Sequence, residues 1–559
     1  MAAADKWTVA RTLDEIGQYV ALNDPNRFKA RAFERAARAV EALAGDFGEL
    51  VASGRIYSTA GIGKSIGPMI AEIVQTGRSR YLEELRAQYP PAIFDLLKIP
   101  GLGLTKIAVL HSQVGIASLD ELETAAREGR LAKLRGFGAK TQARILENIG
   151  KARRRESQFL LPVGLEAGEW LRQRVAAIDE VADTEVVGSV RRRLEVIRNV
   201  NLAIATNNAA AVRRALAGIV DRFEAIDENT FKGTARREID VLFHLSNVKD
   251  FGATLLRTTG SADFVSAFVE KAGRFSAART EQELFEKAGI PFVDPERRES
   301  ADDLGRKKRV RLVEPSDLRG TFHVHTTFSD GRNTVREMLM ASRQRGFDYV
   351  GLSDHSKAAY YAGGLSEDRV REQHREIDEH AGEVAPMRVF RGTEADILPD
   401  GTMDYGAGLA MFDFVVASVH SRFNMPRDEM TARVLHAMDD PHVTFIGHLT
   451  GRLLLSRDGY TVDYDRIFDK AAERAIIIEV NGNPRRLDVD WRHLRRAVDR
   501  GVLLSIHPDA HSIAELAHVI SGTWVARKAG LSPRQIFNTR SLEEVTEFLG
   551  LSPLSPLSP

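Results

Sequence analysis

The sequence predicts a multidomain protein with a helical first part, a mixed α/β middle part and a C-terminal α/β barrel. Its 559 residues exceed what one hydrophobic core usually holds. Up to about residue 155, apolar residues recur every three to four positions, a spacing typical of amphipathic helices. After residue 318, short apolar strands such as YVGLS, FVVASVH, AIIIEV and LLSIH alternate with helical stretches, which indicates an α/β barrel.

The composition is that of an ordinary soluble protein, with 43% hydrophobic and 28% charged residues. No apolar run approaches the roughly 18 residues of a membrane span, and the start, MAAADKWTVAR, lacks the apolar region of a signal peptide. Cysteine is absent, which excludes disulfides and thiolate metal sites and fits a reducing compartment. We therefore expect a cytoplasmic protein without a membrane partner, in which His, Asp and Glu would bind any metal.

Three glycine hairpins interrupt the helical part, and they read TAGIGKSIGPM, IPGLGLTKIAV and LRGFGAKTQAR. Each places an apolar residue and Gly-x-Gly before an amphipathic helix, so that free backbone N–H groups can bind phosphate. One such hairpin is often only a turn. Three in one helical region are typical of helix-hairpin-helix elements, which hold nucleic-acid backbones without reading sequence. The predicted DNA-binding glycines are Gly61, Gly63, Gly101, Gly103, Gly136 and Gly138.

The middle part, from about residue 160 to 245, shows an α/β pattern with strands near 185–187, 201–205 and 238–243. A polar turn, GSVRRR, precedes the strand RNVNLAIAT. Asn199 and Asn201 occupy same-face positions at the start of this strand, where a nucleotide-handling enzyme would normally carry metal-binding acids. The charged segment 294–318 is predicted to be a linker, and the LSPLSPLSP repeat at the end to be a disordered tail.

The last part is rich in histidine, because 13 of the 15 histidines follow residue 318. HVHTTFSDG places His323 and His325 two residues apart on a predicted strand, so both should point to one face. Other His, Asp and Glu residues follow apolar strands, whose ends converge at the mouth of a barrel. A single histidine is more often structural, but nine such ligands predict a site for up to three Zn²⁺, Mn²⁺ or Fe²⁺ ions, suited to phosphate ester hydrolysis. The nine are His323, His325, Asp330, His355, Glu394, His420, His448, Asp509 and His511.

This string of motifs resembles the PHP (polymerase and histidinol phosphatase) domain, with all nine of its usual metal positions filled. The resemblance implies a distorted (β/α) barrel that binds Mn²⁺ or Zn²⁺. It also implies the following ligand sets: His323, His325, Glu394 and Asp509 for one ion; Glu394, His420 and His448 for a second; Asp330, His355 and His511 for a third.

The whole chain resembles a bacterial family X DNA polymerase with a C-terminal PHP domain, which implies an exonuclease acting on DNA 3′ ends in repair. DNA, gapped or with 3′ ends, would be the partner, and a dNTP is the second candidate. The implied division is a lyase-like domain at 1–90, fingers at 91–155, a nucleotidyltransferase palm at 156–245, a thumb at 246–295, a linker at 296–318, the PHP domain at 319–550 and a tail at 551–559.

The chain departs from this family at the palm. The triphosphate-binding element is matched by Gly188, Ser189 and Arg192, whereas Arg193 replaces a usual glycine. Asn199 and Asn201 stand where two aspartates should be, which leaves Asp240 as the remaining palm carboxylate. Nucleotidyl transfer needs two Mg²⁺ ions clamped by several carboxylates, and amide oxygens coordinate weakly. We predict that the palm does not hold catalytic Mg²⁺.

Two further departures concern the thumb and the lyase-like domain. In RTTGSADFV, Arg257, Thr258 and Val265 replace family residues that lie near the sugar and base. Met69 aligns with the lyase lysine, and Lys64 nearby belongs to the turn. The elements that bind phosphate are thus retained, while residues that DNA synthesis requires are changed.

Four functions are compatible with these features. The favoured one is a metal-dependent DNA 3′-5′ exonuclease. The second is a weak, Mn²⁺-dependent gap-filling polymerase in which Glu195 or Glu238 compensates beside Asp240. The others are a non-catalytic scaffold for DNA ends and a small-molecule phosphatase.

Overall fold

The computed structural model describes residues 6–23, 28–41, 47–59, 61–63, 65–99, 101–134, 136–235, 238–305 and 310–551. The chain divides into two compact units, Met1–Ser157 and Gln158–Pro559. Within the described ranges, no helix is both long and apolar enough to cross a membrane. The predicted tail lies outside the described residues beyond Leu551, as does Lys64.

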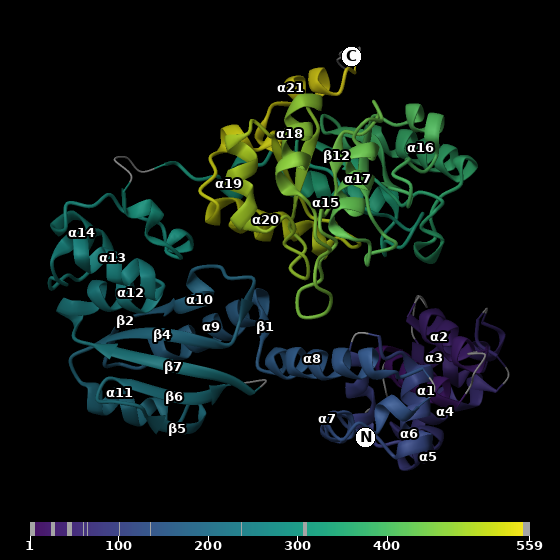
Figure 1. The fold of residues 1–559 in the computed structure, drawn as a ribbon, viewed down its shortest axis with the longest axis horizontal. Helices are drawn as coiled ribbons and strands as arrows, with labels where there is room; N and C mark the ends of the chain where they lie inside the picture. Colours follow the sequence, from purple (N-terminus) through teal and green to yellow (C-terminus); the bar gives the residue numbers. More distant parts are fainter. Residues whose placement is uncertain are drawn as a thin grey trace. The chain divides into compact units, whose positions relative to one another are not determined.

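The first unit is helical, as predicted, and packs around one apolar core. Short 3₁₀ turns lie at Arg55–Ser58, Pro91–Lys98 and Leu131–Lys133. The helices are α1 (Lys6–Asn23), α2 (Phe28–Glu41), α3 (Phe47–Ala52), α4 (Ile66–Thr76), α5 (Arg80–Gln88), α6 (Leu104–Val114), α7 (Leu119–Arg127) and α8 (Ala139–Glu156) (Figure 1).

The three glycine hairpins have one backbone conformation, repeated before α4, α6 and α8. The first glycine of each, Gly61, Gly101 and Gly136, has φ between 88° and 90°, a left-handed conformation that favours glycine. In each hairpin the residue between the glycines donates its N–H to the carbonyl three residues earlier, at 3.0–3.1 Å. That residue is apolar and buried, so it anchors the turn in the core.

The middle part of the second unit is a mixed five-stranded sheet in the order β2-β4-β7-β6-β5. Strands β4 and β7 are parallel and central, with Asn199 opposite Asp240, and the other pairs are antiparallel. The elements are β1 (Phe159–Leu160), α9 (Leu161–Ala176), β2 (Val181–Val187), α10 (Gly188–Arg191), β3 (Val196–Ile197), β4 (Asn199–Thr206), α11 (Ala209–Leu216), β5 (Asp221–Ala225), β6 (Thr230–Ala235) and β7 (Ile239–Ser246).

Three helices follow this sheet and pack around a small core of their own. They are α12 (Phe251–Thr259), α13 (Ala262–Ala272) and α14 (Glu281–Lys287), preceded by a 3₁₀ turn at Val248–Asp250. The start of the predicted linker packs closely, because Arg298 is fully buried and pairs with Glu281. Its 3₁₀ turns lie at Pro295–Arg297, Ala301–Gly305 and Pro315–Asp317.

The C-terminal part is a parallel seven-stranded sheet in the order β14 to β8, curled into a barrel and surrounded by helices, as predicted (Figure 1). The strands are β8 (Gly320–Thr321), β9 (Tyr349–Leu352), β10 (Arg388–Asp396), β11 (Phe414–Ser418), β12 (Phe445–Ile446), β13 (Ile477–Asn481) and β14 (Leu504–His507). The helices are α15 (Val335–Gln344), α16 (Glu367–Ala381), α17 (Arg427–Ala437), α18 (Tyr464–Arg474), α19 (Trp491–Asp499), α20 (His518–Lys528) and α21 (Leu542–Phe548). Short 3₁₀ turns lie at Tyr360–Ala362, Gly382–Val384, Gly406–Met411, Ala514–Ala517, Pro533–Gln535 and Phe537–Thr539.

The barrel is closed between its first and last strands by side-chain and bridging contacts. Val324 forms a parallel bridge with Ala510. The buried amide of Asn538 accepts from Ile506 N at 2.9 Å and donates to Gly320 O at 2.9 Å and Ile506 O at 2.8 Å. One side chain therefore satisfies backbone groups on both edges, which an open sheet would leave unpaired.

The structure corrects one local prediction. His323 and His325 do not lie on a regular strand, because β8 ends at Thr321 and only an isolated bridge at Val324 follows. His323 has φ 61°, so the alternation expected of a strand does not orient it. The pattern also missed β5, β6, β10 and β12.

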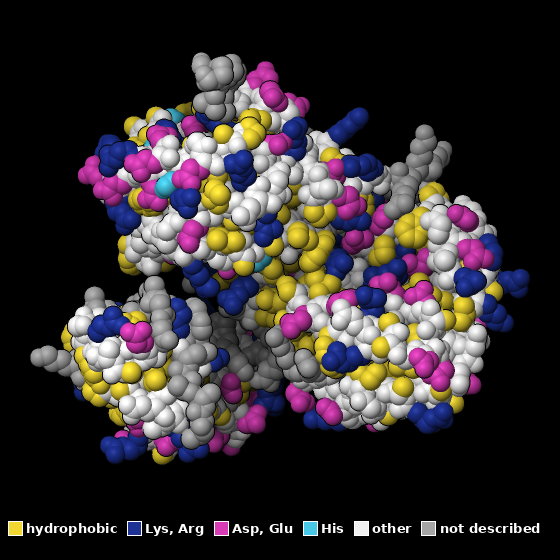
Figure 2. All heavy atoms as spheres, turned by 180° about the vertical axis from the view of Figure 1, so that it is seen from behind, with side chains coloured by type: hydrophobic (Ala, Val, Ile, Leu, Met, Phe, Trp, Pro, Cys, Tyr) yellow, Lys and Arg dark blue, Asp and Glu magenta, His cyan; other side chains and the backbone are white. Residues whose placement is uncertain are grey.

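The surface mixes both signs of charge, in line with the zero net charge of the chain. Figure 2 shows Lys and Arg side chains interspersed with Asp and Glu over the visible face, and little histidine there. Many barrel histidines are instead buried.

Asn538→Ala should destabilise the barrel, because buried backbone groups of Ile506 and Gly320 would lose their partners. We expect a loss of about 2–3 kcal/mol and a fall of roughly 2–4 °C in the unfolding midpoint of the second unit. Calorimetry of the full chain measures this. Asn207→Ala, at an exposed position, is the control and should leave the midpoint unchanged. Equal midpoints for both variants would refute the closing role of Asn538.

Candidate metal centre and palm site

The nine side chains predicted to bind metal converge at the carboxyl-terminal ends of the barrel strands. Glu394 lies on β10, and the others follow β8, β9, β11, β12 and β14 by a few residues. Their ligand atoms form overlapping groups in which all atoms lie within 4.8 Å of one another, and these groups include all nine residues. The parallel barrel thus collects residues that are 188 positions apart, from His323 to His511.

Glu394 is the centre of this cluster. Its Oε1 lies 2.9 Å from His448 Nε2, 3.2 Å from His420 Nε2 and 3.3 Å from His323 Nε2. Its Oε2 lies 2.9 Å from His355 Nδ1. Two oxygens of one carboxylate therefore face separate sets of imidazoles, which is the arrangement needed to bridge two cations.

Asp330 organises the more open side of the cluster. Its Oδ1 lies 3.3 Å from His511 Nε2, 3.6 Å from His355 Nε2 and 3.9 Å from His325 Nδ1. The side chains of Asp330 and His511 are 36% and 28% exposed, whereas Glu394 is 1% exposed. Solvent therefore reaches the cluster from the Asp330 side.

The donor set fits divalent cations. Several buried atoms that face the cluster have no hydrogen-bond partner among the described residues, and buried polar atoms are normally paired. Imidazole nitrogens and carboxylate oxygens together suit Zn²⁺ or Mn²⁺. The unpaired atoms are Nε2 of His323, both ring nitrogens of His325, Nδ1 of His355, Nδ1 of His448 and Oε1 of Glu394.

Opposing charges tune the protonation of these groups. Burial alone would lower the pKa of His355, but the carboxylates of Glu394 and Asp330 outweigh it and raise the pKa to about 10. Burial, with the neighbouring imidazole of His511, lowers the pKa of His325 to about 3. Burial would raise the pKa of Glu394, but the adjoining imidazoles hold it well below its usual range. Protons on the imidazoles thus offset the negative charge of the carboxylates until a bound cation displaces these protons.

Sequence reasoning missed the residues that support the cluster from behind. Glu479, on β13, accepts His323 Nδ1–H at 2.6 Å and a hydrogen bond from His507 Nδ1 at 2.9 Å. Its other oxygen accepts from His448 N at 2.9 Å and Asn481 Nδ2 at 2.7 Å. Glu479 and His507 are fully buried, and their presence inside the apolar strands IIIEV and LLSIH was the available signal. Asp396 orients His420 in the same way, because its Oδ1 lies 2.7 Å from His420 Nδ1.

The side-chain amides of Asn199 and Asn201 form a hydrogen bond with each other. Asn201 Nδ2 donates to Asn199 Oδ1 at 2.7 Å, and Asn201 Oδ1 lies 3.0 Å from His244 Nε2, which donates to it. A Cβ at Gly188 would lie 3.1 Å from Asn201 Nδ2, so the turn packs directly on this pair. Two aspartates here would need cations between them, whereas two amides form a neutral hydrogen-bonded chain.

Asp240, the predicted palm carboxylate, is exposed and lies opposite Asn199 in the register. Both acids considered as compensating ligands have arginine partners. Glu195 is buried and lies 3.1 Å from Arg492 of the barrel, and the exposed Glu238 pairs with Arg222 at 3.2 Å. Glu195 is therefore held by the barrel, whereas the solvated pair holds Glu238 only weakly.

Arg192, predicted to bind a triphosphate, is held by neighbouring groups. Its Nε donates to Glu299 Oε1 at 2.9 Å and its Nη1 to Thr259 O at 2.6 Å. Lys528 of α20, 1% exposed, donates to Glu299 Oε1 at 2.7 Å and to Arg192 O at 2.9 Å. We call Arg192, Glu299 and Lys528 the seam, because they join the palm, the following segment and the barrel. Arg193 keeps the left-handed φ of 56° that suits the glycine it replaces.

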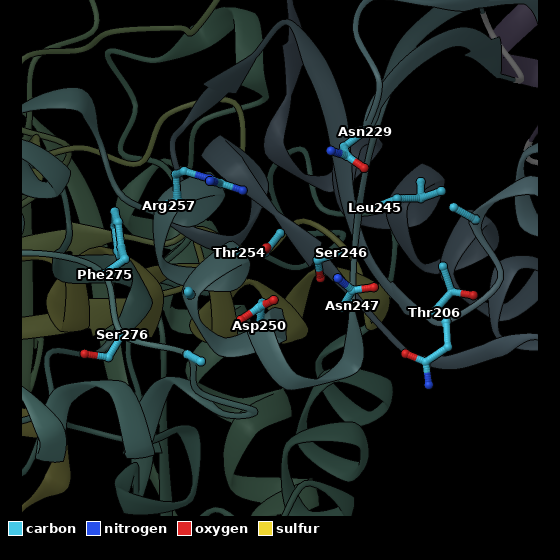
Figure 3. Close-up of a pocket in the computed structure, with 14 residues that line it drawn as sticks. Thr206, Asn229, Leu245, Ser246, Asn247, Asp250, Thr254, Arg257, Phe275 and Ser276 are labelled. Carbon is cyan, nitrogen blue, oxygen red and sulfur yellow. The ribbon is translucent and has the colours of Figure 1, made fainter.

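A pocket of about 400 Å³ lies at the far end of the palm strands from Asn199 and Asp240. Figure 3 shows Arg257 and Thr254 of α12 on one side, with Asp250 and Asn247 below them and Asn229 across the pocket. Arg257 is exposed and contributes to the low pKa of His244, after burial. The substituted thumb position therefore adds a positive charge to this end of the palm.

Glu479→Gln should weaken metal binding, because an amide cannot accept hydrogen bonds from His323 and His507 at its nitrogen. Substitutions behind a metal ligand typically cost about 10–100-fold in affinity. Calorimetric titration with Mn²⁺ and the metal content of the purified protein measure the loss. Glu473→Gln, exposed on α18, is the matched control. An affinity for Glu479→Gln equal to that of the control would contradict the positioning role.

Comparison with protein families assigns the helical part of the chain and most of the barrel. A helix-hairpin-helix domain matches residues 5–79, and a SAM-like helix-hairpin-helix tandem matches residues 93–151. The PHP domain matches residues 321–483. Asp509 and His511 lie beyond the matched range, and the barrel geometry brings them to the other seven residues.

Curated relatives agree with these matches. A probable phosphatase of Clostridium acetobutylicum is 27% identical over 170 residues, which cover 28% of this chain and 62% of that protein. The "DNA polymerase/3'-5' exonuclease PolX" of Bacillus subtilis is 33% identical over 567 residues, covering 97% of this chain and 99% of that protein. The chain therefore belongs to the bacterial family X DNA polymerases that carry a C-terminal PHP domain.

Proposed function

We propose that this protein is a metal-dependent DNA 3′-5′ exonuclease of DNA repair, in which the barrel performs the hydrolysis and the palm no longer supports synthesis. The observation that carries the proposal is the convergence of nine His, Asp and Glu side chains with unpaired, buried ligand atoms at the barrel mouth. The Bacillus subtilis relative has both activities in its name, and the cation would be Mn²⁺ or Zn²⁺.

The residues of the mouth have distinct roles in this proposal. Bound cations would lower the pKa of a water and stabilise the leaving oxygen. Glu394 would hold two of them together, while Glu479 keeps His323 in the tautomer that presents Nε2 to the cluster. The exposed side of the cluster, at Asp330 and His511, would admit the phosphodiester.

The helical unit supports DNA as the substrate. A Cβ built on Gly63, Gly103 or Gly138 meets no described atom within 4 Å, so a phosphate can approach the backbone closely. Such contacts hold DNA regardless of sequence, as a repair enzyme requires. We propose that the protein acts on DNA in the cytoplasm.

The alternative is a weak, Mn²⁺-dependent gap-filling polymerase, favoured by Asp240 and by the name of the relative. Against it stand the neutral pair of Asn199 and Asn201 and the engagement of Arg192 by Glu299. A dNTP would have to displace this arginine from a half-buried carboxylate before its triphosphate could bind.

His323→Ala with His325→Ala should abolish shortening of a 5′-labelled primer in Mn²⁺. We expect at least a ~100-fold loss, because the cations supply several kcal/mol of charge stabilisation. Binding of the same DNA, measured by fluorescence anisotropy, should change little. His436→Ala, at an exposed position, is the control. Persistent shortening by the double variant would place the nuclease outside the barrel.

Asn199→Asp with Asn201→Asp should destabilise the second unit in EDTA, because two carboxylates would replace a hydrogen-bonded pair. Like charges about 4 Å apart repel by up to ~4 kcal/mol near a protein surface. Mn²⁺ should restore the unfolding midpoint, with at most partial synthesis. Asn199→Asp alone is the control, since Asn201 can still donate to it. Full template-directed synthesis by the double variant would show that these two amides alone had blocked the reaction.

A further inference from the structure

Two exposed tyrosines lie at the rim of the metal centre. Tyr360 and Tyr361 are 86% and 61% exposed, and among the described residues after 157 no other aromatic side chain is as exposed. Neighbouring exposed apolar side chains that form a contiguous patch often mark a binding site. Their position therefore needs an explanation.

The pair is adjacent to the cluster. The ring of Tyr361 lies 6.5 Å from that of His420, in an edge-to-face orientation, and 6.0 Å from that of Tyr360. Partial burial, and then the charges of Asp396, Glu394 and Asp330, raise the pKa of Tyr361.

The loop that carries the tyrosines is firmly held. It starts directly after His355, and Leu365 N donates back to His355 O at 2.9 Å. Ala359 and Ala362, which flank the pair, are buried, and Ala358 N donates to Asp404 Oδ2 at 2.7 Å. The rings thus project from a fixed base.

Basic groups complete the rim. Arg486 Nε lies 3.0 Å from Asp509 Oδ2, and its charge acts on Tyr361. Arg457 also lies within electrostatic range of both Arg486 and Tyr361. Aromatic rings beside basic groups are the combination with which proteins hold unpaired nucleic acid, the rings stacking on bases and the cations on phosphates.

We propose that Tyr360 and Tyr361 stack on the last bases of the DNA strand that enters the metal centre, and so position the terminal phosphodiester at Asp330 and His511. The substrate is thereby recognised through its bases without sequence preference, since every base has an aromatic face. The inference rests on the proposed function, because it concerns the strand that the barrel would cut. The tyrosines act as positioning residues.

The test compares a single-stranded oligothymidylate with the same strand whose last two nucleotides are abasic. The wild-type protein in Mn²⁺ should have roughly a tenfold lower KM for the strand with bases, with a similar kcat. Tyr360→Ala with Tyr361→Ala should remove this difference, leaving the abasic strand degraded as by the wild type. Tyr360→Phe with Tyr361→Phe is the matched control, which keeps the rings and should keep the preference. Unchanged metal content of the alanine variant shows that the centre is intact.

A second measurement does not depend on cleavage. An oligothymidylate ending in 2-aminopurine should lose fluorescence on binding to the wild type and to the phenylalanine variant, and not on binding to the alanine variant. Quenching without cleavage would reject the proposed nuclease while leaving the stacking role. A base preference that survives in the alanine variant, or an equal loss on both strands, would overturn the inference.

Discussion

The barrel is organised around one buried carboxylate, that of Glu394. A lone charge in the interior would lose several kcal/mol of hydration. Here both oxygens face imidazoles from four strand ends, so the charge is tolerated only when those ends lie in register. Barrel closure, through the Val324 bridge and Asn538, therefore matters to the chemistry: it sets the position of His323 against Glu394.

The palm and the barrel answer the same electrostatic problem in opposite ways. The barrel keeps acids together and offsets them with imidazoles that a cation can replace. The palm carries two amides at the start of β4, which hydrogen-bond to each other and to His244 without any ion. The first arrangement is poised to take up metal, and the second is complete without it. The name of the Bacillus subtilis relative combines polymerase and exonuclease activities, whereas the two sites of this chain differ in their capacity to bind metal.

Much of the architecture could be predicted from the sequence, because periodicity reports buried faces directly. Helical spacing and the three glycine hairpins predict the first unit, and apolar strands followed by His or Asp predict the barrel. The short strand β12 was not predicted because two residues carry no period, and β10 was not predicted because its end, FRGTEAD, has few apolar residues. Glu479 and His507 were not predicted as supporting residues, because the sequence does not show which residue a polar side chain inside an apolar strand will contact. The engagement of Arg192 depends on Glu299, 107 positions away, and only the fold brings the two together.

The seam has a consequence for how the chain can be divided. The PHP family match starts only at residue 321, yet Lys528 of the barrel is buried against Glu299 and the backbone of Arg192, and the half-exposed Arg492 pairs with Glu195. A barrel cut out on its own would expose the ammonium group of Lys528, whose counter-charge at Glu299 stays behind. Likewise, a palm without the barrel would leave the buried Glu195 without the barrel arginines that it contacts. Although its metal centre is built entirely from residues 323–511, the barrel is one half of a charge-paired body.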